Sequence, residues 1–205
     1  EYDVPMARAT SNGYYKEMLE IMKGFMQALK DNQCIKLAVI TGCLKIAKES
    51  IFTGTNNFVS NTITSSRLNE YYGFVQNEVD RILEDAEIKG KGDIMKKWYD
   101  GYHFGDVDVY CPWDVMCYVD DLQKNPNAKP DEYWKDTSDN AIIRSFIDYA
   151  GASITKKLET LMNGGYIIQR VDENLTYDYL HSSEENLWSL MYLTGYLTQV
   201  RDYKN

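Results

Sequence analysis

Pairs of carboxylates are the residues of this chain whose types and spacing could support chemistry. Two neighbouring carboxylates can share a metal ion or divide the roles of general acid and general base. The candidate pairs are Glu1 with Asp3, Asp106 with Asp108, Asp120 with Asp121, Asp172 with Glu173 and Glu184 with Glu185. Acid pairs are common in the solvated turns and helix caps of an acidic protein, so most of these pairs are predicted to be structural. Glu1 and Asp3 stand apart because of the residues that follow them.

The sequence contains none of the common motifs that would complete a catalytic site. There is no GxxxxGK[ST] phosphate loop, no GxGxxG after a strand, no HExxH and no GxSxG. The cysteines have no CxxC spacing and the two histidines, His103 and His181, lie far apart, so no zinc site is predicted. A metal-dependent hydrolase that uses Asp106 and Asp108 is an alternative, but no further ligands can be named for it.

The composition is that of an ordinary globular protein with an acidic surface. Twenty-two basic and 31 acidic residues give a net charge of −9, which opposes nonspecific attraction to nucleic acid and to anionic lipid. No apolar run reaches the roughly 20 residues that a membrane span needs, and nothing at the N-terminus is typical of a secretory signal. Cys34, Cys43 and Cys117 lie among apolar neighbours, which favours buried, reduced thiols and a cytoplasmic protein.

The first elements are predicted to be a helix and a buried strand. In residues 11–33, apolar side chains recur at steps of three and four, which predicts an amphipathic helix with a Met-rich core face and with Ser11 or Asn12 as its cap. The apolar run CIKLAVITG, residues 34–42, predicts a strand covered on both faces, as in parallel sheets. The polar loop that follows leaves the end of that strand, where ligands usually bind in open α/β sheets, although it could equally be an ordinary connection.

The rest of the chain is predicted to be mostly helical, with short strands. We expect helices within residues 65–90 and 93–98, a small strand or hairpin between Trp98 and Pro112, and a helix from Pro112. Farther along, we expect helices at 140–150 and 153–165, a hairpin at 166–180, a helix from 183 and a strand at 197–200. Two of the four prolines fall within residues 124–139, the best linker candidate. The fold class that follows is α+β and helix-rich.

Several motifs in this order resemble the AAA-ATPase-like family of bacterial proteins. They are EYDVP, KLAVITGCLKIAKESIFTGTNNF, KKWYDGYHFG, VYCPWDV, YWKDTSDN and LWSLMYLTGYLT. The resemblance covers nearly the whole chain. It implies a P-loop NTPase domain followed by a helical, winged-helix-like part, often with a nuclease-like domain of the PD-(D/E)XK type after it. No nuclease motif is present in this sequence, so the resemblance does not predict DNA cleavage by this chain.

On this resemblance, EYDVP is the tail of a Walker B element. Glu1 matches the acid that polarises the attacking water, and Asp3 matches the last acid of the motif. Thr41 matches the end of the next sheet strand, where P-loop ATPases place a polar sensor beside the γ-phosphate, although it could equally be a hydroxyl that satisfies a strand-end carbonyl. Lys45 and Arg67 are weaker basic candidates. The cofactors implied are ATP and Mg²⁺ in the full-length protein, with no metal ligand in this chain.

The resemblance also implies a fragment that begins inside Walker B. Residues 1–68 would be the C-terminal remnant of the P-loop core, and residues 69–205 the helical and winged-helix-like module. The chain would bind and hydrolyse nucleotide only as part of the longer protein, because phosphoryl transfer needs a loop that cradles the phosphates. Strand edges exposed at residues 36–42 would favour self-association or a protein partner.

The alternative function is a binding module without enzymatic activity. Residues 140–200 would contact protein or nucleic acid, and the nearby basic residues are Arg144, Lys156, Lys157 and Arg170. The acidic net charge favours a protein partner over DNA.

Overall fold

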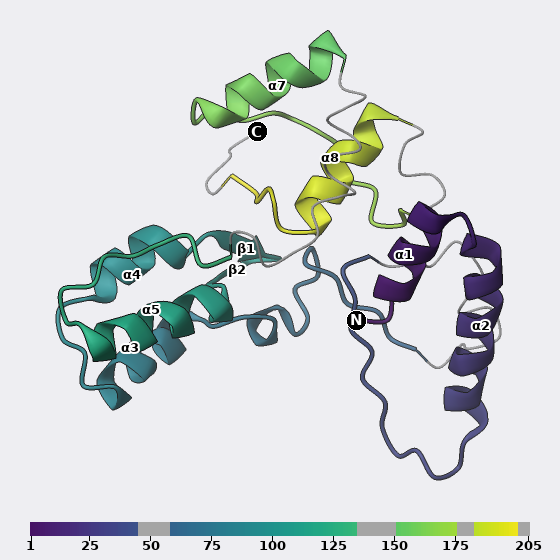
Figure 1. Ribbon diagram of the computed structural model, residues 1–205, viewed down its shortest axis with the longest axis horizontal. Helices are drawn as coiled ribbons and strands as arrows, with labels where there is room; N and C mark the ends of the chain where they lie inside the picture. Colours follow the sequence, from purple (N-terminus) through teal and green to yellow (C-terminus); the bar gives the residue numbers. More distant parts are fainter. Residues whose placement is uncertain (45–57, 135–150, 176–182, 201–205) are drawn as a thin grey trace. The chain divides into compact units, whose positions relative to one another are not determined.

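The structure is a computed structural model that describes residues 1–44, 58–134, 151–175 and 183–200 (Figure 1). The chain forms two compact units, each built from two stretches of sequence. The first unit comprises Glu1–Ser60 and Ile143–Leu197, and the second comprises Asn61–Ile142 and Thr198–Asn205. The described residues are rich in helix and contain one two-stranded sheet, which confirms the helix-rich α+β class. The domain boundary predicted between residues 68 and 69 stays a prediction.

Two packed helices open the first unit. Helix α1 (Val4–Asn12) and helix α2 (Tyr15–Asp31) are joined at Gly13, whose φ of 77° is a left-handed conformation that glycine adopts readily. The prediction of a cap at Ser11 or Asn12 was wrong, because both residues belong to the last turn of α1. The predicted core face of α2 is confirmed at Tyr15, Met22 and Met26, which are buried.

The strand predicted at residues 34–42 was wrong. These residues form no strand, and the side chains of Leu37 and Val39 are 81% and 80% exposed. A strand needs a hydrogen-bonded neighbour, and the only strands among the described residues pair with each other in the second unit. Residues 34–42 therefore have no described strand beside them to pair with. Self-association through residues 36–42 stays a prediction.

The remainder of the first unit contains helices α7 (Ala152–Met162) and α8 (Glu184–Leu193). The hydroxyl of Ser183 caps α8 by accepting a hydrogen bond from the amide of Asn186. The ammonium group of Lys157 on α7 contacts Glu184 at 2.7 Å and lies over the ring of Trp188, which ties α7 to α8. Both helices lie where the sequence predicts helices.

Two further strand predictions were wrong where they can be compared. Residues 166–175, the described part of the hairpin predicted at 166–180, contain no strand, and neither do residues 197–200. The helix predicted at 140–150 lies outside the described residues.

The second unit holds the hairpin and its supporting helices. A short 3₁₀ helix η1 (Asn69–Tyr71) precedes α3 (Gln76–Asp85) and α4 (Gly92–Tyr99). Strands β1 (Tyr102–Phe104) and β2 (Val107–Val109) pair antiparallel, and α5 (Pro112–Lys124) follows (Figure 1). The core is formed by buried side chains from all three α-helices and by Tyr110, the residue directly after β2, and includes Val79, Leu83, Met95, Val115 and Tyr118. The helices predicted for this region are confirmed, and of the strand or hairpin expected between them the structure has the hairpin.

The described part of residues 124–139 is tied to this unit by hydrogen bonds. The hydroxyl of Tyr99 donates to the carbonyl of Asp131 at 3.0 Å and accepts from its amide at 3.1 Å. The hydroxyl of Tyr133 donates to Asp121 at 2.6 Å, and that of Tyr118 donates to the carbonyl of Ala128 at 3.2 Å. Residues 125–134 are therefore anchored on α4 and α5.

The cysteines are all unpaired thiols, as the sequence predicts, but Cys34 and Cys43 are exposed and not buried. Across the described ranges, every helix is too short or too polar to cross a bilayer.

Candidate functional site

The N-terminal EYD stretch lies directly against residues 41–44. The amide of Tyr2 donates to the carbonyl of Thr41 at 2.9 Å, and the hydroxyl of Tyr2 donates to the carbonyl of Leu44 at 2.6 Å. The structure therefore brings together two stretches about 40 residues apart in sequence, and these hold the three predicted site residues Glu1, Asp3 and Thr41.

Asp3 is the centre of this contact. Its side chain is almost fully buried, and its Oδ2 accepts hydrogen bonds from the amides of Cys43 and Leu44, both at 3.0 Å. A carboxylate that accepts backbone N–H groups fixes their loop, because leaving those donors unpaired in a buried place costs about 1–3 kcal/mol each. Asp3 therefore positions residues 41–44. The catalytic role that the resemblance implies for Asp3 stays a prediction.

Gly42 makes the close approach possible. A Cβ at this position would lie 2.6 Å from the ring of Tyr2 and 2.8 Å from Oδ1 of Asp3. Any larger residue would push the two stretches apart.

Glu1 and Thr41 are exposed at the edge of this contact. Glu1 faces Cys43, with 3.8 Å between its Oε1 and the Sγ of Cys43. An exposed carboxylate could orient water, which is the chemistry predicted for Glu1. Lys45 lies outside the described residues, and Arg67 belongs to the second unit.

Sequence reasoning missed Cys43, whose chemistry is shaped by its acidic neighbours. Burial of the thiol, and then the negative charges of Asp3 and Glu1, raise the pKa of Cys43 from 9.0 to about 11, although the residue as a whole is exposed. A higher pKa leaves less of the reactive thiolate at neutral pH.

We expect Cys43 to alkylate about 100-fold more slowly at pH 7–8 than the same residue in the unfolded chain, because a pKa raised by about two units lowers the thiolate fraction by that factor. The rate should climb about tenfold per pH unit until about pH 11. Peptide-resolved mass spectrometry after iodoacetamide treatment measures this, with the urea-unfolded chain as the control. Equal rates in the folded and the unfolded chain would contradict the geometry.

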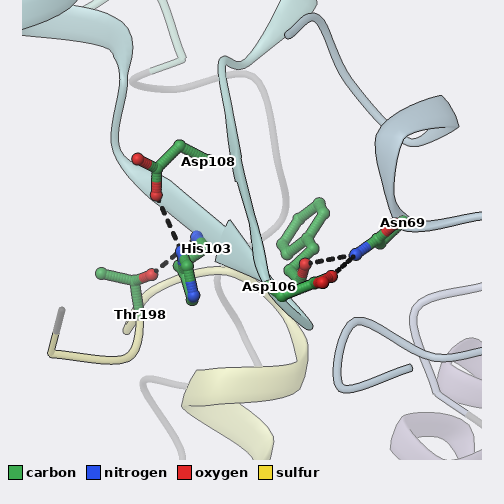
Figure 2. Close-up of polar contacts among 6 residues, drawn as sticks. Asn69, His103, Asp106, Asp108 and Thr198 are labelled. Atoms are coloured by element: carbon green, nitrogen blue, oxygen red, sulfur yellow. Dashed lines mark hydrogen bonds and ion pairs between the residues drawn. The ribbon is translucent and has the colours of Figure 1, made fainter. Parts of the chain in front are cut away.

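A second polar cluster lies on the β1–β2 hairpin (Figure 2). The Nδ1 of His103 and the Oδ1 of Asp108, which face each other in the strand register, are 2.7 Å apart. The amide of His103 donates to the hydroxyl of Thr198 at 3.1 Å. The carboxylate of Asp108 therefore orients the imidazole, and the hairpin is pinned to the C-terminal stretch of its own unit.

The tip of the hairpin is held by Asn69. Its side-chain amide, which is buried, donates to Asp106 at 2.7 Å and to the carbonyl of Phe104 at 3.0 Å (Figure 2). The amide of Gly105 donates to the carbonyl of Ile63 at 2.9 Å. Asp106 thus contacts Asn69, whereas Asp108 contacts His103. Among the residues that the structure describes, no group of three His, Cys, Asp or Glu side chains could hold a metal ion, so the hydrolase alternative gains no support.

The comparisons with known proteins agree with the motifs. Residues 1–52 match the AAA-ATPase-like family model, described as a predicted AAA-ATPase. The chain is also 25% identical, over 201 residues, to an "Uncharacterized protein in vnfD 5'region" of Azotobacter chroococcum mcd 1. This alignment covers 97% of the chain and 36% of the relative's length. No solved structure matches the chain. The resemblance to the AAA-ATPase-like family is thereby confirmed.

Proposed function

We propose that residues 1–52, which match the AAA-ATPase-like family model, form one wall of a nucleotide-hydrolysing centre in a longer protein. The chain spans about a third of the length of the curated relative it matches, so the activity proposed is that of the whole protein. In this centre Glu1 orients and deprotonates the attacking water, and Thr41 senses the terminal phosphate.

The observation that carries this proposal is the contact between the EYD stretch and residues 41–44. The acid and the sensor of a P-loop ATPase come from the ends of neighbouring segments and must face the same phosphate. The hydrogen bond from the amide of Tyr2 to Thr41 and the two bonds accepted by Asp3 hold Glu1 and Thr41 in one place. Asp3 supports the site as a positioning residue.

The residues present do not by themselves fit Mg²⁺ or ATP. Oδ2 of Asp3 already accepts two amide hydrogen bonds, and no set of three metal ligands forms among the described residues. The sequence also has no Gly-rich loop with a lysine to cradle phosphates. ATP and Mg²⁺ would have to be held by other parts of the longer protein.

Nucleotide turnover by the 205-residue chain and by the longer protein tests the proposal. The chain alone, mixed with Mg²⁺ and ATP, is expected to release no phosphate above the blank, because its sequence has no phosphate loop to cradle the transferred group. A longer protein that includes an upstream phosphate loop should bind and hydrolyse ATP. Hydrolysis by the 205-residue chain would contradict the proposal, and so would a full-length protein that binds no nucleotide.

A further inference from the structure

The second unit carries exposed aromatic side chains at one place. Trp113 and Trp134 are each 51% exposed, and Met116, one turn after Trp113 on α5, is 48% exposed. The Nε1 of Trp113 donates to the carbonyl of Tyr133, the residue directly before Trp134, at 3.0 Å. The two tryptophans therefore emerge from adjoining points, and Trp113, Met116 and Trp134 are called the aromatic surface below.

The backbone under this surface is held in place before any partner arrives. The hydroxyl of Tyr133 bonds to Asp121 of α5, and Tyr99 bonds to both backbone groups of Asp131. The backbone of Trp134 also hydrogen-bonds to the carboxylate of Asp114 in the first turn of α5. A rigid frame reduces the ordering cost of binding, and exposed tryptophans on such a frame are typical of interface hot spots.

The charges around the aromatic surface are mostly negative. Residues 111–134 contain five acids, Asp114, Asp120, Asp121, Asp131 and Glu132, and two lysines, Lys124 and Lys129. Lys124 is paired with Asp120. Asp131 and Glu132 are exposed three and two residues before Trp134. An anionic lipid surface or a nucleic acid would be repelled, and so would the same surface on a second copy of the chain.

We propose that the aromatic surface docks an arginine-bearing segment of a protein partner. A guanidinium group stacks on the face of an indole through a cation–π interaction and pairs with nearby carboxylates. Trp113 and Trp134 supply the faces, Asp131 and Glu132 supply the carboxylates, and Met116 covers the apolar part of the arginine side chain. This binding function lies beyond the nucleotide chemistry proposed for residues 1–52 and is independent of it.

Binding of a simple cationic peptide to the whole chain tests the proposal. The probe is a blocked nine-residue peptide of alternating arginine and alanine, titrated by calorimetry, and the matched probe has glutamate in place of arginine. We expect the arginine peptide alone to bind, and Trp134→Ala to weaken it by about tenfold. The Tyr71→Ala variant is the matched control, because Tyr71 is a 73% exposed aromatic of the same unit outside the aromatic surface.

Two further measurements keep the outcome decisive. Glu132→Lys reverses an exposed charge without removing an aromatic ring, and it should also weaken binding. This variant keeps the proposal testable if Trp134→Ala alters folding. If the Trp134→Ala, Glu132→Lys and unaltered chains bind the peptide with equal affinity, the binding comes only from general attraction to a chain with a net charge of −9. That result would overturn the proposal. A dimer in sedimentation that Trp113→Ala dissociates would assign the surface to a second copy and overturn it too.

Discussion

Glu1→Gln, introduced into a longer protein that contains the phosphate loop, should lower the rate of ATP turnover by about 10²–10⁴-fold, the usual contribution of a positioned general base. Glutamine has nearly the same size as glutamate and can still accept a hydrogen bond, but it cannot take a proton from water. The dissociation constant for the nucleotide should stay unchanged, because Glu1 is exposed and contacts the attacking water and not the phosphates in the proposed site. Steady-state phosphate release and nucleotide titration measure the two quantities.

The matched control for this experiment is Glu17→Gln. Glu17 is an exposed acid in the first turn of α2, so the substitution removes the same charge from the same unit, away from the contact with Thr41. Turnover in this variant should equal that of the unaltered protein. A Glu1→Gln protein that hydrolyses ATP at the normal rate would remove Glu1 from the mechanism, whereas a loss of nucleotide binding in that variant would mean that Glu1 shapes the binding site.

The helices were predictable because their signals are local. The spacing of Val79 and Leu83 in α3 and the proline that opens α5 each act within a few residues, and both helices are found where the sequence predicts them. The hydrogen bond that caps α8 at Ser183 is equally local. The strand at residues 34–42 was not predictable in this sense. Its apolar pattern describes a segment that can be buried in a sheet, but the hydrogen-bonding partners of a strand come from elsewhere in the chain.

The candidate site was predicted in its residues but not in its contacts. The resemblance named Glu1, Asp3 and Thr41, yet the bonds that join their two stretches run to backbone amides and carbonyls, which a sequence does not display. Cys43 was missed for the same reason. The pairing of His103 with Asp108 could have been predicted from the sequence, because a two-residue turn at Gly105 and Asp106 places positions 103 and 108 opposite each other.

Gly105→Ala should destabilise the second unit far more than Gly90→Ala. Both glycines have a left-handed backbone, with φ of 60° and 69°, so alanine costs about 1–2 kcal/mol at either position. A Cβ at Gly90 meets no atom within 4 Å, whereas at Gly105 it would lie 2.7 Å from the carbonyl oxygen of Ser65 and 2.9 Å from Nδ2 of Asn69. The second substitution therefore adds a steric clash to the same backbone cost.

The clash at Gly105 should also break polar contacts. Moving the tip of the hairpin away from Ser65 stretches the bond from Gly105 to Ile63 and the bonds that Asn69 makes to Phe104 and Asp106. Together these effects should bring the loss to about 3–5 kcal/mol, in the range of mutations that disrupt a buried polar network. Urea unfolding of both variants, followed by near-ultraviolet circular dichroism, measures the difference. Equal losses at the two glycines would mean that the backbone near Ser65 yields to a methyl group, and that the hairpin tip contributes little to the stability of its unit.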